Sequence, residues 1–143
     1  KYRIIYIIDG MNMGGAERLL LQIILNLNTS LSLLEYAFHK RGNNNLTEQL
    51  QQKGIQIDLL NIKRIFDFKA IPKIIYYLQK NKADIVHTQL QISDILGNIS
   101  SSFIGTPSVC TIHTLMSQAT TQKNKIKQNL EWFIRLHCCQ RVI

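Results

Sequence analysis

The chain has 143 residues and a formal net charge of +8, and 45% of its residues are hydrophobic. This length suffices for one domain that buries its own core without a metal or disulfide. No apolar run reaches the ~18 residues of a membrane span. Residues 1–8 are basic and then apolar, but they lack the long apolar core and small-residue cleavage site of a signal peptide. We therefore expect neither a membrane span nor a signal peptide within these residues, and the composition favours an ordinary globular domain.

The three cysteines, Cys110, Cys138 and Cys139, are odd in number, and two of them are adjacent. This spacing argues against a disulfide framework or a zinc site, and it suits a reducing cytoplasm. The excess of positive charge is compatible with a phosphorylated ligand, a nucleic acid or an anionic membrane. It is equally compatible with solubility alone.

The first half of the chain alternates between strand and helix patterns. Residues 2–8 form a nearly continuous apolar run, as in a buried parallel strand. Residues 15–27 predict a helix whose polar stripe of Arg18, Gln22 and Asn26 is narrow, so most of its circumference should be buried. A strand at 33–38, a short helix at 46–53 closed by Gly54 and a strand at 55–60 follow.

The second half continues the alternation. Residues 67–82 predict an amphipathic helix with Asp67 as N-cap, although Pro72 in its second turn could delay the start. Phe68, Ile71, Ile74, Ile75 and Leu78 share its apolar face. The pattern then gives a strand at 84–88, a helix at 93–104 closed by Gly105, a strand at 108–113, a helix at 123–139 and the opening of a sixth strand at 141–143.

This order predicts an α/β fold, a Rossmann-like doubly wound parallel sheet. Because a sixth strand has only begun at the last residues, we expect the natural protein to continue beyond them.

In an open parallel sheet, ligands bind beyond the carboxyl ends of the strands. The loop after the first strand ends in Gly14 and Gly15, where a helix starts. Free N–H groups at a helix start suit a phosphate, and glycine permits its close approach. The spacing is neither G-x-G-x-x-G nor a P-loop. The alternative interpretation is a turn that needs positive φ and tight helix packing.

Two histidines, His87 and His113, end strands at this same predicted edge. His113 is the better candidate for a ligand contact, although a structural role remains open for both.

We expect Asp9 to serve loop hydrogen bonding rather than to act as a base. Glu17 lies in a first helical turn, where it steadies the helix dipole. His137 shares a helix with Cys138 and Cys139, and side chains in a row on one helix do not converge on a metal, so no metal site is predicted.

Four stretches in order resemble the N-terminal domain of family-four retaining glycosyltransferases, which have the two-domain GT-B fold. They are MGGAERLLLQIILNL (13–27), DIVHTQLQISDILGN (84–98), GTPSVCTIHT (105–114) and NLEWFIRLHCCQRVI (129–143). The resemblance implies that Gly14 and Gly15 form the donor diphosphate and acceptor loop. It also implies that His113 is the catalytic-site histidine that contacts the transferred sugar, and that His87 and Asp94 line the acceptor side.

The resemblance further implies a nucleotide-diphosphate sugar as donor substrate, with no metal and no covalently bound cofactor. Residues 1–143 would be the acceptor-side N-terminal domain. The donor-binding C-terminal domain, with most nucleotide contacts, would be absent, and this chain alone would be inactive.

The resemblance also implies a saccharide or lipid-linked acceptor and a role in cell-surface glycan and polysaccharide synthesis. Lys69, Lys73 and Lys80 form a basic stripe with Tyr76 beside it, which predicts a contact with an anionic membrane surface. We therefore expect a cytoplasmic protein that is peripheral at the inner face of the membrane.

Two other functions remain open. Lys40 and Arg41 after the second strand could receive the phosphate of NADP in a Rossmann oxidoreductase, although the glycine fingerprint is broken. The stretch KRIFDFK (63–69) interleaves basic and aromatic residues, as in a non-catalytic basic binding module, but no nucleic-acid motif is present and no nucleic-acid partner is expected.

Overall fold

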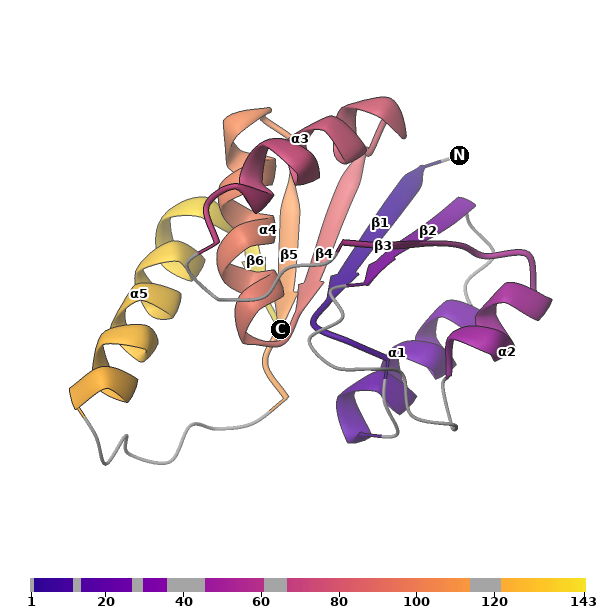
Figure 1. Ribbon diagram of the computed structural model, residues 1–143, viewed down its shortest axis with the longest axis horizontal. Coiled ribbons are helices and arrows are strands. Elements are labelled where there is room, and N and C mark those ends of the chain that lie inside the picture. Colours follow the sequence, from indigo (N-terminus) through magenta and orange to yellow (C-terminus); the bar gives the residue numbers. More distant parts are fainter. Residues whose placement is uncertain (1, 12–13, 27–29, 36–45, 61–66, 114–121) are drawn as a thin grey trace.

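The computed structural model describes residues 2–11, 14–26, 30–35, 46–60, 67–113 and 122–143. Its centre is a six-stranded sheet in the order β3-β2-β1-β4-β5-β6, and every neighbouring pair is parallel (Figure 1). This is the strand order of Rossmann folds. The predicted doubly wound α/β architecture is therefore confirmed.

The strands are short and the helices separate them in sequence. The strands are β1 (Arg3–Ile8), β2 (Ser30–Glu35), β3 (Gln56–Leu59), β4 (Ile85–Gln89), β5 (Ser108–Thr111) and β6 (Arg141–Val142). The helices are α1 (Gly15–Asn26), α2 (Thr47–Gln52), α3 (Ala70–Lys80), α4 (Gln91–Phe103) and α5 (Gln122–Cys138).

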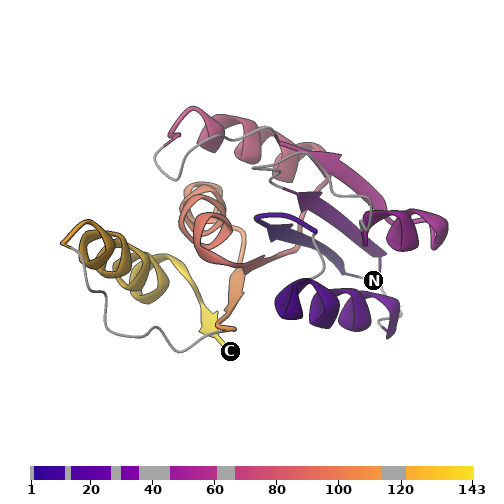
Figure 2. The same cartoon turned by 60° about the horizontal axis from the view of Figure 1, so that its bottom comes forward.

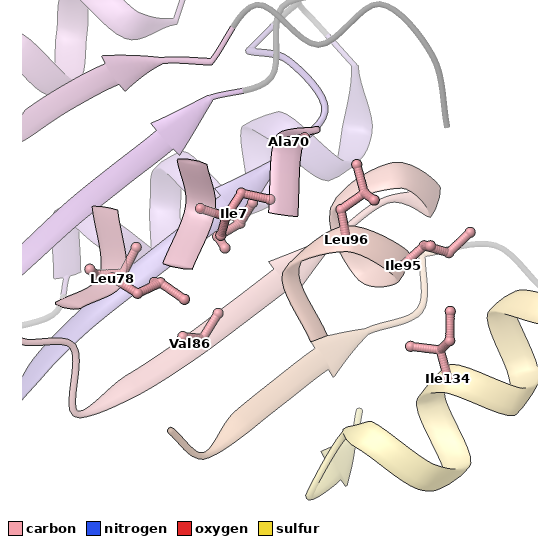
Figure 3. Close-up of a cluster of buried hydrophobic side chains, with 9 residues drawn as sticks. Ile7, Ala70, Leu78, Val86, Ile95, Leu96 and Ile134 are labelled. Atoms are coloured by element: carbon pink, nitrogen blue, oxygen red, sulfur yellow. The ribbon is translucent and has the colours of Figure 1, made fainter. Parts of the chain in front are cut away.

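Each face of the sheet has its own hydrophobic core. On one face, Ile5, Ile7 and Val86 pack against α3, α4 and α5 (Figure 3). On the other face, Tyr6 and Ile8 pack against α1 and α2. Figure 2 shows α1 on the opposite side of the sheet from α3 and α4. The two cores follow from the alternation of side chains along β1.

The predicted glycine caps are confirmed, because Gly54 and Gly105 have φ values of +76° and +69°. The start of α3 is not as predicted: the helix begins at Ala70, and the N-cap residue Lys69 makes no side-chain capping hydrogen bond. Asp67 contributes only its backbone carbonyl, which accepts from the N–H of Ala70 at 2.9 Å. The chain therefore enters α3 through a backbone turn.

Three burial or register predictions were wrong. Strand β2 begins at Ser30, three residues earlier than predicted, because it pairs with β1 from Arg3 onward; residues 36–38 lie outside the described residues. Phe68 precedes α3 and is 58% exposed. Helix α1 buries only Leu20, Leu21 and Ile24, since it contacts the sheet along one side.

Candidate functional site

The carboxyl ends of β1, β4 and β5 bring together the side chains from which the site is built. Strand β1 pairs with β4, and β4 pairs with β5 so that Gln89 lies beside Thr111. Since side chains alternate, His87 and Gln89 lie on the same face of β4. This is the face on which Tyr6 packs, because the Tyr6 and His87 rings are 4.9 Å apart.

His87 is fixed within the sheet. Its Nε2 lies 2.7 Å from the Oγ1 of Thr111 on the neighbouring strand. Burial, and to a smaller extent the nearby His113, lower the pKa of His87 to about 4. The ring is therefore neutral at physiological pH and has a hydrogen-bond partner, so its geometry favours the structural alternative over a ligand contact.

His113 lies just beyond β5, and its ring is half-buried. Its Nε2 is 3.0 Å from the Oε1 of Gln89. Partial burial lowers the pKa of His113, and the carboxylate of Glu17 opposes this shift. The ring lines an open cavity of about 280 Å³ at the sheet edge; the other lining residues are Leu90, Gln91, Thr111, Ile112, Glu131 and Arg135. Of the two predicted histidines, His113 is thus the one that lines this cavity.

Asp9, at the end of β1, caps helix α4 from a distant part of the chain. Its carboxylate accepts hydrogen bonds from the backbone N–H groups of Ser93 and Ile92, at 2.7 and 3.2 Å, and from the Ser93 hydroxyl at 2.6 Å. Asp9 therefore serves hydrogen bonding, as predicted, although its partners belong to a helix start. Because this carboxylate already neutralises the α4 dipole, α4 is no open anion site.

The residue between β4 and α4 has a strained backbone. Leu90 has φ 73° and ψ 164°, a region that residues other than glycine rarely adopt. Such conformations cost about 1–3 kcal/mol and cluster at functional sites. Leu90 also lines the cavity beside His113. The turn is therefore a strained segment in the wall of the candidate site.

Helix α1 begins at the predicted glycines, but a positive-φ turn does not explain them. Gly54 and Gly105 are the glycines with positive φ in the described part of the chain, so Gly14 and Gly15 have ordinary backbone conformations. A Cβ on Gly15 would meet no atom within 4 Å, whereas one on Gly14 would come within 2.2 Å of the Glu17 carboxylate. Gly15 is therefore open to a ligand, and Glu17 occupies the space beside Gly14.

Asp94 does not line a surface, which corrects the prediction that it contacts the acceptor side. Its side chain is fully buried and forms an ion pair with Arg135, whose guanidinium also bonds Glu131 at 2.6 Å. Burial raises the pKa of Asp94 to about 6, although Arg135 opposes the shift. The acid supports the cavity wall by holding Arg135.

Sequence reasoning missed Glu131, Arg135 and Gln91. Glu131 and Arg135 are 1% and 4% exposed, yet both line the cavity beside His113. The Gln91 side chain donates to the Oε2 of Glu131 at 3.0 Å. The i,i+4 spacing of Glu131 and Arg135 was the available signal, but such pairs are common on exposed helices.

The three predicted membrane-facing lysines are exposed, Lys73 and Lys80 on α3 and Lys69 at its N-cap. Tyr76 lies among them and is 66% exposed. Helix α3 covers the face of the sheet opposite α1, so the stripe is separate from the face that carries His87 and Gln89.

Lys40, Arg41 and residues 63–66 lie outside the described residues, so the NADP and nucleic-acid alternatives receive no test at those positions. Within the described ranges, no three His, Cys, Asp or Glu side chains gather in a group that could hold a metal ion. The same residues contain no helix that is both long and apolar enough to cross a membrane.

Similarity to characterised sequences gives the family. The family model described as Glycosyltransferase Family 4 matches residues 13–143. A UDP-Gal:alpha-D-GlcNAc-diphosphoundecaprenol alpha-1,3-galactosyltransferase of Escherichia coli is 33% identical over an alignment of 87 residues that covers 58% of this chain and 22% of that protein.

Solved structures share the fold at low sequence identity. HepE of Anabaena in complex with UDP-glucose has a TM-score of 0.79 at 15% identity, over 99% of this chain and 37% of HepE. MurG of Acinetobacter baumannii has a TM-score of 0.66 at 15% identity, over 99% of this chain and 40% of MurG. The chain thus spans well under half the length of these relatives. Because the family model matches nearly the whole length of this chain, the chain belongs to Glycosyltransferase Family 4.

Proposed function

We propose that this chain is the acceptor-side N-terminal domain of a retaining glycosyltransferase. The full protein would move a sugar from a nucleoside-diphosphate sugar to a saccharide or lipid-linked acceptor in cell-surface glycan synthesis. One observation carries the proposal: His113, with access to a cavity, lies at the same sheet edge as the open start of α1. The carboxylate of Glu17 on α1 opposes the lowering of the His113 pKa, which supports this proximity.

The donor diphosphate would bind at the start of α1. The first N–H groups of a helix have no intrahelical partners, and they carry partial positive charge. Gly15 leaves space for a phosphate to approach these groups. The Glu17 carboxylate beside Gly14 would have to move when two phosphates arrive, because like charges repel. In this proposal the helix start stabilises the leaving group without a metal ion.

The reaction would replace one bond at the anomeric carbon. The bond from that carbon to the diphosphate oxygen breaks, and the acceptor hydroxyl oxygen forms the new bond on the same face. The hydroxyl proton passes to the departing phosphate oxygen. A neutral His113 could hydrogen-bond a sugar hydroxyl beside the positive charge that develops at the anomeric carbon. Its lowered pKa supports the neutral form.

The acceptor would enter the 280 Å³ cavity beside His113. Gln91, Glu131 and Arg135 supply polar groups there, and Leu90 and Ile112 supply apolar surface. This mixture suits the hydroxyls and ring face of a sugar. The name of the Escherichia coli relative, which gives UDP-Gal as donor and a diphosphoundecaprenol-linked GlcNAc as acceptor, supplies the first substrates to try.

Transfer assays with the full-length protein test this proposal. A panel of UDP- and GDP-sugars is incubated with GlcNAc-diphosphoprenol and with free oligosaccharides, and products are identified by mass spectrometry and by anomeric NMR couplings. We expect transfer from one donor with its anomeric configuration retained. Inversion would overturn the retaining mechanism, and donor-independent NADPH oxidation would favour the oxidoreductase.

We also propose that α3 rests on the cytoplasmic face of the membrane. Lys69, Lys73, Tyr76 and Lys80 recur every three or four residues and are all exposed. Lysines can attract anionic lipid while a tyrosine ring enters the interface. This arrangement would bring a lipid-linked acceptor to the enzyme without a spanning helix.

A further inference from the structure

Two side-chain hydrogen bonds connect β4 to β5 on the face that carries His87. His87 bonds Thr111 at 2.7 Å, and two residues further along the chain in both segments Gln89, at the end of β4, bonds His113, just beyond β5, at 3.0 Å. The strands are parallel, so both bonds join residues with the same separation in sequence. The second bond is the one that ends at the cavity.

Gln89 is suited to hold a partner in place. It has no exposed surface, whereas His113 is half-buried. Its amide oxygen faces His113, and its Nε2 makes no hydrogen bond within the described residues. Keeping a buried donor unpaired costs about 1–3 kcal/mol. Burial of this amide is therefore unfavourable for stability alone, which is the pattern of a residue retained for a site.

The backbone on both sides of Gln89 is also constrained. Gln89 pairs with Ile8 of β1 and with Thr111 of β5, so it lies between two strands. The next residue, Leu90, adopts the strained conformation described above, and Asp9 holds the helix start that follows. The Gln89 side chain therefore projects from a rigid base.

We propose that Gln89 is the positioning residue of His113: its amide oxygen accepts the Nε2–H of the ring, fixes the ring orientation and leaves Nδ1 as the free acceptor. This inference rests on the proposed transferase function for its kinetic consequence only. With the proton held on Nε2, the ring presents a single acceptor nitrogen to a sugar hydroxyl. Among the residues that the structure describes, the charged and titratable groups that face or neighbour His113 are His87 on β4, Glu17 on α1, and Glu131 and Arg135 on α5.

The structural consequence is measured on donor-free, full-length protein with ¹⁵N-labelled histidine. Nitrogen shifts should show His113 as the Nε2–H tautomer in the wild type. Gln89→Leu keeps the side-chain bulk but removes the acceptor, so His113 should become a mixture of tautomers. Gln89→Glu should raise the pKa of His113 by about one unit, because a carboxylate stabilises the imidazolium.

The kinetic consequence is measured on the same variants. We expect Gln89→Leu to lower kcat about tenfold while the donor KM changes less than twofold. Because Gln89→Glu raises the pKa of His113, this variant should be more active at high pH, where the ring is neutral, than at low pH. Ser101→Ala, which removes a buried hydrogen bond within α4, is the matched control for general destabilisation and should keep wild-type kcat. In a double-mutant cycle, Gln89→Leu should cost little once His113 is alanine.

The outcomes separate the two proposals. An unchanged His113 tautomer and titration in both Gln89 variants would overturn the positioning role, whether or not the enzyme is active. Additive losses in the double-mutant cycle would overturn it too. A shifted tautomer in a protein that transfers no sugar would support the positioning role while contradicting the proposed function.

Discussion

At the scale of single residues, the two histidines at the sheet edge differ in access. His87 bonds Thr111 and packs against the Tyr6 ring at a tilt of 38°, whereas His113 bonds Gln89 and lines the cavity. Both rings favour the neutral state, because burial lowers the pKa of each. The difference in function that we propose therefore comes from access to the cavity rather than from charge.

His113→Ala tests that difference. If its contact with the sugar strengthens in the transition state, the variant should lose about 10–100-fold in kcat, the equivalent of about 1.4–2.8 kcal/mol, with a smaller change in donor KM. Steady-state kinetics and the melting temperature of the full-length protein are the measurements. His137→Ala is the matched control, because His137 is exposed on α5 and its ring lies against Phe133. Wild-type turnover of His113→Ala, or its unfolding, would return His113 to a structural role.

The Asp94, Glu131 and Arg135 cluster predicts a pH effect on stability. The folded-state pKa of Asp94 is raised to about 6, above its ordinary value, so the folded protein binds a proton more readily than the unfolded chain. The associated stability is present below pH ~4 and is lost as pH rises through about 6. Unfolding free energy should rise by about 1 kcal/mol between pH 7 and pH 5 from this group.

Glu131→Gln is the variant that tests this effect. It removes a negative charge that raises the pKa of Asp94, and it also removes a carboxyl whose own pKa is raised by burial, so the gain in stability between pH 7 and pH 5 should shrink. Denaturant titrations at several pH values measure the difference. Glu48→Gln, on the exposed side of α2, provides the control and should leave the pH dependence unchanged. Equal pH dependence in wild type and Glu131→Gln would contradict the coupling.

At the scale of elements, glycines at helix ends have two different roles: Gly15 leaves space at the start of α1, whereas Gly54 adopts a positive φ after α2. Gly15 has an ordinary φ and free space around a Cβ, so Gly15→Ala should fold normally and gain about 0.4–1 kcal/mol through a less flexible unfolded chain. If the diphosphate approaches this backbone, the added methyl should raise the donor KM at least fivefold. Gly54→Ala should do the reverse: its φ of +76° makes alanine cost about 1 kcal/mol, with donor KM unchanged. An unaltered KM in Gly15→Ala would place the phosphates elsewhere.

Helix α3 carries the prediction for membranes. Replacing Lys69, Lys73 and Lys80 by glutamine should abolish most binding to anionic vesicles, since each lysine contributes about 1 kcal/mol near such a surface. Lys53, Lys82 and Lys125 are exposed and lie outside the stripe, so their triple replacement removes equal charge and should retain binding. Co-sedimentation over a salt series measures both. Equal losses in the two triple variants would indicate a general charge effect.

At the scale of the whole molecule, local chemistry made the element order predictable from sequence, whereas the site depended on distant partners. Gly54 and Gly105 mark helix ends through their own backbone preference, and the apolar runs mark strands. Asp94 was misplaced because its partner Arg135 is 41 residues away. Gln89 follows the strand predicted at 84–88, and nothing nearby in sequence signals its hydrogen bond to His113. Leu19 and Leu25 on α1 were expected inside, yet they are 47% and 38% exposed.

This chain covers only part of the length of the solved structures it resembles, and this fact leads to the last prediction. The chain spans 36% to 40% of the length of HepE and MurG, and the described residues offer a helix start and His113 but no basic side chain bonded at that helix start. A nucleoside diphosphate carries several negative charges, which one helix start offsets only in part. Residues 1–143 alone should therefore melt cooperatively but show no transfer and bind UDP more weakly than about 1 mM, whereas the full-length protein should turn over. Circular dichroism, UDP titration by calorimetry and the transfer assay are run on both proteins in parallel. Turnover by residues 1–143 alone would show that the reaction needs no second domain, and an uncooperative melt would show that this part does not fold independently.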